Sequence, residues 1–204
     1  MAEFSKPTLN APPFPPLKWD GHFWKCRTIL NSWRGFQSRL GAYGAVSSTT
    51  ESDGAVRLSV VPPGGVVAQP PAVEQANAYR HLLDHEEEIR DAILQAIFDA
   101  YPAMRARYPF GEELAVKEMP TLDRPEQLRA LLGLSIVHVL NVAKDGAAYV
   151  GFEFGCTWEE EHGLGVLTHR SRPVAIPFLG GATVSAADVA SEEWIAEVDS
   201  ESFG

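Results

Sequence analysis

The chain has little cysteine, few basic residues and no long apolar runs, and each shortage excludes a class of protein. Only two of its 204 residues are cysteines, Cys26 and Cys156, and their spacing matches neither a disulfide framework nor a metal site. We therefore expect both to be small buried hydrophobic residues, as suits a chain in a reducing compartment.

The shortage of basic residues indicates which kinds of partner to expect. The 27 acidic residues outnumber the 17 lysines and arginines, which gives a formal net charge of −10 and a pI near 5.0. Nucleic-acid binding relies on basic side chains that neutralise phosphates, so we expect no nucleic-acid partner. A basic protein is the natural complement. No stretch approaches the roughly 20 apolar residues of a membrane span, and the N-terminus lacks the apolar segment of a signal peptide, so we expect a cytoplasmic protein with no membrane partner.

The length and the 45% hydrophobic content fit one domain with appendages. Residues 1–16 are expected to form a Pro-rich N-terminal arm outside the core, because five prolines between Lys6 and Pro16 exclude a helix. Residues 17–180 are expected to form a single domain. Residues 181–204 are an acidic C-terminal tail, in which Ser185 to Val198 can form a short amphipathic helix.

The hydrophobic pattern predicts an α+β domain with an antiparallel sheet packed against two or three helices. A helical period runs from Pro71 to Tyr101, with a break or bend near His85, because Asp84 and Glu87 resemble a capping box. Residues 41–54 are expected to form a loop that flanks the strand at 55–61, and residues 105–121 have no clear period. The remaining predicted elements are strands within 18–36, at 55–61 and at 134–143, 147–158, 163–169 and 172–178, and a short helix at 124–132.

The most informative segment runs from Tyr149 to His169. At strand spacing its large apolar side chains share one face, which we expect to be core: Val150, Phe152, Phe154, Cys156 and Trp158. An acidic run, Glu159, Glu160 and Glu161 followed by His162, then connects to a second strand and is expected to be exposed. A buried hydrogen bond between His138 and Glu153 is conceivable, because their strands are expected to be neighbours.

Residues 151–166 read Gly-Phe-Glu-Phe-Gly-Cys-x-Trp-x-Glu-Glu-His-Gly-x-Gly-Val. This pattern resembles the signature of an uncharacterised bacterial family, and the helical stretch from Gln75 through Tyr79 to Tyr101 is also similar to that family. The likeness covers roughly Trp19 to Ile176. It implies a stand-alone partner or immunity protein of the kind found around polymorphic toxin loci, and it carries over no catalytic residues.

The sequence contains few residue clusters that indicate catalysis or metal binding. His81 and His85 lie one helical turn apart, but Leu82 stands where a zinc-protease helix has glutamate. The cluster of His162 and His169 with the acidic run is the only one suited to acid–base chemistry.

We therefore expect no enzyme, no catalytic residue, no cofactor and no metal. The leading hypothesis is an immunity-type protein that occludes a cognate toxin with an acidic surface. The predicted contact residues are Trp158, Glu159, Glu160, Glu161 and His162. The alternatives are a small enzyme or metal-dependent protein that uses the cluster at 159–169, or a structural partner protein.

Overall fold

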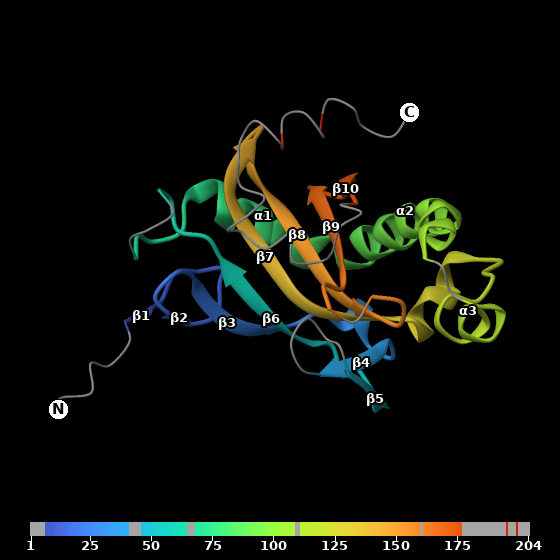
Figure 1. Cartoon of the computed structure of the whole chain (residues 1–204). Helices are drawn as coiled ribbons and strands as arrows, with labels where there is room; N and C mark the ends of the chain where they lie inside the picture. Colours follow the sequence, from blue (N-terminus) through green and yellow to red (C-terminus); the bar gives the residue numbers. More distant parts are fainter. Residues whose placement is uncertain are drawn as a thin grey trace.

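The computed structural model describes residues 7–40, 46–64, 68–108, 111–159 and 161–176, together with Ile195 and Asp199. Its centre is an eight-stranded sheet with two long helices against one face, as Figure 1 shows. A separate two-stranded hairpin lies at one end of the sheet. The architecture is α+β, as the sequence predicts.

The strands of the large sheet lie in chain order: β1 (Thr8–Leu9), β2 (Leu17–Trp19), β3 (Trp24–Ile29), β6 (Ala55–Val60), β7 (Leu132–Lys144), β8 (Ala147–Cys156), β9 (Leu164–His169) and β10 (Arg172–Ala175). Neighbouring strands are antiparallel, except that β6 and β7 are parallel. A parallel pair needs a long crossover, and here the crossover contains both long helices of the described residues. The second sheet pairs β4 (Gln37–Leu40) with β5 (Val46–Glu51), where the sequence predicts a loop over most of the length.

The crossover contains α1 (Val73–Asp84), α2 (Glu86–Arg107), α3 (Glu112–Glu118) and the 3-10 helix η3 (Pro125–Ala130). The predicted break at His85 is confirmed, since α1 ends and α2 begins on either side of it. Tyr79 and Leu82 of α1 and Ile93 and Ile97 of α2 are almost fully buried against the sheet. The sequence did not predict α3. None of the helices in the described part of the chain is long and apolar enough to cross a membrane.

The predicted core face of β8 is confirmed. Its even-numbered side chains are at most 5% exposed: Val150, Phe152, Phe154, Cys156 and, just past the strand, Trp158. The odd-numbered positions are buried as well, so both faces of β8 are covered. The turn into β8 is the predicted one, because Asp145 and Gly146 both have positive φ, 49° and 76°, as a tight hairpin requires.

The N-terminal arm differs from the expectation that residues 1–16 lie outside the core. Within its described part, β1 pairs with β2, and Phe14 is 6% exposed with its ring stacked on Tyr79 at 4.8 Å between centroids. The prolines exclude a helix but not an extended segment that inserts one aromatic ring. The predicted C-terminal helix lies outside the described residues apart from Ile195, which packs in a second apolar cluster with Tyr149 and Leu167.

Candidate functional site

The predicted acidic tip connects β8 to β9, and the fold holds its first glutamate. Tyr108 donates a hydrogen bond from its hydroxyl to Oε2 of Glu159 over 3.0 Å, and Nδ1 of His162 donates to Oε1 over 3.2 Å. The Glu159 side chain is only 24% exposed, whereas Glu161 is exposed. Glu160 lies outside the described residues. The predicted exposure is therefore wrong for Glu159 and confirmed for Glu161.

Trp158 is the second correction at the tip. Its side chain is 5% exposed, and its ring packs edge-on against Tyr101 with 5.5 Å between centroids. A ring at this depth is not available to a partner unless the loop unfolds. Burial thus confirms Trp158 as core and removes it from the predicted contact surface, which leaves Glu161 and His162 as its exposed described members.

The histidine cluster required by the enzyme alternative is not assembled. His162 precedes β9 and His169 ends it, so the two rings lie at opposite ends of one strand. Nε2 of His169 donates to the carbonyl oxygen of Lys144 over 2.9 Å, and its ring packs against Tyr149 at 4.8 Å. The His169 side chain therefore makes its contacts within the sheet and not at the hairpin tip.

The other histidine pairs serve the fold. Nε2 of His138 lies 3.2 Å from Oε2 of Glu153, with both residues buried, so the predicted hydrogen bond is confirmed. The rings of His81 and His85 stack at 4.2 Å, and burial together with the neighbouring ring lowers the pKa of His81. No group of three or more histidine, cysteine or acidic residues is placed to hold a metal ion within the described ranges.

Neither cysteine is activated. Burial raises the pKa of Cys156 to about 12 and that of Cys26 to about 11. Because the thiolate is the reactive form, both remain poor nucleophiles at neutral pH. Both are free thiols, and the predicted burial is confirmed for Cys156, whereas Cys26 is only half-buried.

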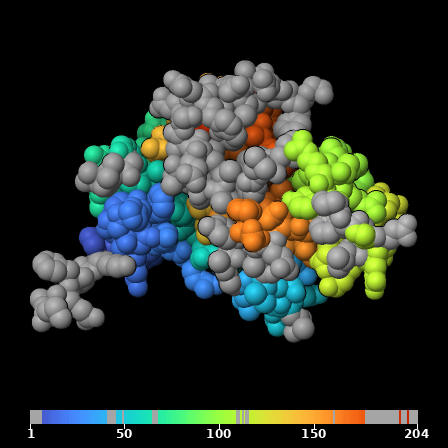
Figure 2. All heavy atoms as spheres, in the orientation of Figure 1, coloured from blue at the N-terminus to red at the C-terminus, as the bar shows by residue number. Residues whose placement is uncertain are grey.

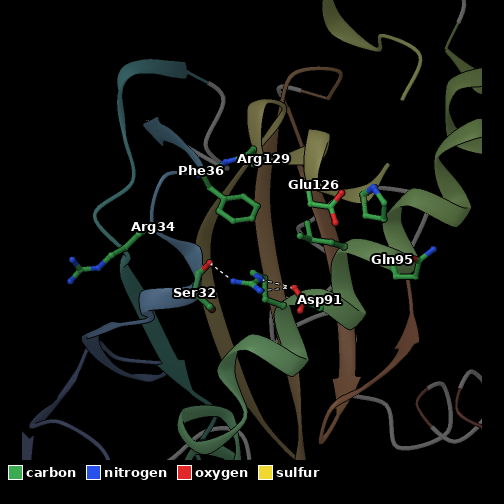
Figure 3. Close-up of a pocket in the computed structure, with 10 residues that line it drawn as sticks. Ser32, Arg34, Phe36, Asp91, Gln95, Glu126 and Arg129 are labelled. Atoms are coloured by element: carbon green, nitrogen blue, oxygen red, sulfur yellow. Dashed lines mark hydrogen bonds and ion pairs between the residues drawn. The ribbon is translucent and has the colours of Figure 1, made fainter. Parts of the chain in front are cut away.

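A groove of about 510 Å³, the α2–η3 groove, lies between α2, η3 and the segment that follows the 3-10 helix η1 (Asn31–Trp33), as Figure 3 shows. Its lining comes from three distant stretches of the chain. The residues are Ser32, Arg34, Phe36, Arg90, Asp91, Leu94, Gln95, Pro125, Glu126 and Arg129.

The groove has an apolar floor under a fixed cation. Phe36 and Leu94 are each 5% exposed. The guanidinium of Arg129 lies 5.8 Å above the centroid of the Phe36 ring, and it donates hydrogen bonds of 3.0 and 3.3 Å to the carbonyl oxygen of Gly35. The cation is therefore held in place over the aromatic ring.

The opposite wall is braced from α2. Arg90 forms an ion pair of 2.7 Å with Asp91 and donates to the carbonyl oxygen of Ser32, and Figure 3 shows these contacts as dashed lines. Glu86 accepts a hydrogen bond of 2.6 Å from the Ser32 amide. The Ser32 hydroxyl oxygen is buried and has no hydrogen-bond partner among the described residues, an uncommon state for a polar atom. The walls are thus fixed by contacts within the chain.

An acidic row borders the groove along α2. Glu87, Asp91, Gln95 and Asp99 recur every four residues and are all exposed, so they form one face of the helix, which we call the acidic ridge. The helix dipole favours the acid of the first turn, but Asp91 and Asp99 lie beyond that turn. The negative charges of Asp91 and Asp99 therefore gain no stabilisation from the helix dipole.

Sequence reasoning missed the groove because its walls meet only in the folded chain. The sequence predicts strands within 18–36 and a short helix at 124–132, and neither prediction indicates that these segments meet α2. One signal was available: Glu87, Asp91 and Asp99 are separated by four and eight residues, which marks a single charged face of a helix, and that face borders the groove.

The comparison with curated proteins and that with solved structures gave no match. The model of one family, described as Domain of unknown function (DUF6985), matches residues 52–183. The match spans β6 to β10, with α2, η3 and the hairpin tip between them. The resemblance to immunity proteins stays a prediction. Because the matched residues make up more than half of the chain, the protein belongs to the DUF6985 family.

Proposed function

We propose that the chain is an immunity-type binding protein that neutralises a cognate protein toxin by covering it, with the α2–η3 groove and the acidic ridge as its contact surface. The observation that carries the proposal is the meeting of the two features at Asp91 and Gln95, which line the groove and belong to the ridge. The mechanism is association rather than turnover. The hairpin tip becomes secondary, because its aromatic residue is buried and its first glutamate is engaged.

The groove has the composition of an anchor site. Binding energy at protein interfaces concentrates in a few aromatic and arginine residues at well-packed pockets. Here Phe36 and Leu94 form the floor, and Arg129 and Arg90 are held at the walls by contacts within the chain. A pre-shaped pocket of this kind loses little side-chain entropy when a partner side chain enters it.

The acidic ridge supplies the long-range electrostatic attraction to the partner. Complementary charges accelerate encounter, and added salt screens the effect. The ridge presents Glu87, Asp91 and Asp99 to solvent on a chain of net charge −10, which favours a basic toxin surface. Glu161 and His162 at the hairpin tip remain exposed and fit a peripheral role.

The test expresses in cells the protein encoded by the gene next to that of this chain, and it measures whether this chain protects those cells and how fast the two purified proteins associate. The double variant Glu87→Lys with Asp99→Lys should lower the association rate and weaken its salt dependence. Folding should change by no more than about ±0.5 kcal/mol per exposed site. The matched control, Glu113→Lys with Asp123→Lys, makes the same charge change at exposed residues that do not line the groove.

A second pair of variants tests the groove. Gln95→Trp places a large ring at the groove wall and should raise the dissociation rate, whereas Ala103→Trp adds the same ring to an exposed position on α2 that does not line the groove. Equal protection by the ridge variant and its charge control would reject the ridge. A neighbouring gene product that is harmless to cells, or that this chain does not bind, would reject the immunity function.

A further inference from the structure

A second hollow, of about 440 Å³, lies where the β4–β5 hairpin meets the large sheet. Figure 2 shows the hairpin, in cyan, beside the blue N-terminal strands. Three arginines from three different strands line this hollow: Arg27 of β3, Arg39 of β4 and Arg57 of β6. We call it the arginine hollow. It shares no lining residue with the α2–η3 groove.

Two of the arginines face each other directly. Arg27 and Arg57 are partners in the antiparallel register of β3 and β6, and both are exposed. Like charges placed opposite each other on antiparallel strands destabilise the sheet. In a chain of net charge −10, pairing two cations in this way is unexpected from composition. An anion bound between the two guanidinium groups would remove the repulsion.

The contacts of Arg27 and Arg57 leave guanidinium donors available. Arg57 donates to Oγ of Ser135 over 2.7 Å, which orients one arm of its guanidinium. Arg27 makes no hydrogen bond or ion pair with any residue in the described ranges. Two carboxylates, Glu51 and Asp53, also line the hollow, and Asp53 accepts a hydrogen bond of 2.9 Å from the amide of Ala55. The side chains that line the hollow therefore carry three positive and two negative charges, a net charge of +1.

A glycine fixes the third arginine against the sheet. A Cβ atom at Gly133 of β7 would lie 2.2 Å from the carbonyl oxygen of Gln37 and 2.9 Å from Cγ of Arg39. Only glycine allows β4 to approach β7 this closely. Arg39 is also hydrogen-bonded to Gln37, so the hairpin presents its guanidinium from a fixed position.

We propose that the arginine hollow binds a phosphate group, either as free phosphate or as part of a small phosphorylated ligand. Guanidinium groups bind phosphate and carboxylate oxygens with paired, charge-assisted hydrogen bonds. One arginine suffices for the two oxygens of a carboxylate. Arg27 and Arg57 offer donors from two facing strands, with the Ser135 hydroxyl beside Arg57 and the positive charge of Arg39 in the same hollow, and this arrangement fits the several oxygens of phosphate.

The experiment titrates the full chain in phosphate-free buffer with inorganic phosphate, a nucleoside monophosphate and acetate. Calorimetry gives the affinities, and amide chemical shifts give the location. We expect both phosphate ligands to bind and to shift the amides around Arg27 and Ser135, with acetate much weaker. Tighter binding of the monophosphate would indicate a phosphorylated ligand, and equal binding would indicate free phosphate.

The variant Arg27→Gln should weaken phosphate binding by about tenfold or more, the loss of one charge-assisted hydrogen bond. In phosphate-free buffer its melting temperature should be no lower than that of the native chain, because the repulsion with Arg57 is gone. Arg34→Gln is the matched control, since it removes an exposed arginine that lines the other groove. Phosphate affinity unchanged in Arg27→Gln, acetate as tight as phosphate, or no heat and no amide shift with either phosphate ligand would overturn the proposal.

Discussion

Replacement of Asp199 by Asn tests whether the C-terminal tail is fastened to the sheet by one carboxylate. The Asp199 side chain is 2% exposed and accepts hydrogen bonds from the side chains of Lys144, Arg172 and Tyr149. These donors lie on β7, β10 and β8, so a single residue of the tail is tied to three strands. The variant keeps the shape of the side chain and removes its charge.

The size of the effect follows from the pKa. Burial alone would raise the pKa of the Asp199 carboxyl, but the three donors outweigh burial and lower it from 3.8 to about 2. That difference corresponds to about 2 kcal/mol of folding free energy. Lys144 and Arg172 are about half exposed, so water solvates both cations in the variant, and no large penalty for a buried unpaired charge is added.

The sign of the pH dependence is fixed because the folded pKa is the lower one. The stabilisation is fully present above about pH 5, where the carboxyl is ionised in both states, and it is lost as the pH falls toward about 2. Urea unfolding of the native chain and of Asp199→Asn from pH 7 to pH 2 should therefore give a difference of about 2 kcal/mol that shrinks below about pH 5. Asp123→Asn, at an exposed site, is the control. A difference near zero at pH 7, or one that does not change with pH, would refute the reasoning.

Three further substitutions test the packing. Phe154→Ala should lower the free energy of unfolding by about 3 to 5 kcal/mol, because it leaves a cavity beside Trp33 in the core, and chemical denaturation measures this loss. Phe14→Ala should cost about 3 kcal/mol by the same measurement, and a melting temperature equal to that of the native chain would show that the N-terminal segment does not pack on Tyr79. Gly133→Ala should cost about 1 to 3 kcal/mol through overcrowding and should also weaken phosphate binding, since the hairpin must shift; unchanged stability with unchanged binding would contradict the close approach.

Local signals in the sequence predicted the local parts of the fold. The Asp145-Gly146 turn, the break at His85 and the buried face of β8 each depend on residues close together in the chain, and each is confirmed. The parallel pairing of β6 with β7 was not predictable in this way, because it joins strands more than 70 residues apart. The sequence predicts a loop at residues 41–54, where β5 forms, because the Ser- and Thr-rich β5 lacks an apolar face.

The pattern of residues 151–166 suggests a contact site when only the sequence is considered, but the fold gives this pattern a structural cause. Residues 151–166 combine glycines, aromatic residues and a buried glutamate. All ten residues of β8 are buried, because the strand has neighbours on both edges and is covered on both faces. Gly155 lies opposite Gly133, where β4 crosses the sheet, and Glu153 meets His138. Packing on four sides restricts each position, so the unusual pattern has a structural cause. A partner can contact only surfaces whose residues are not restricted by packing. On α2 such a surface shows in the sequence as charged residues at helical spacing, which are exposed in the fold.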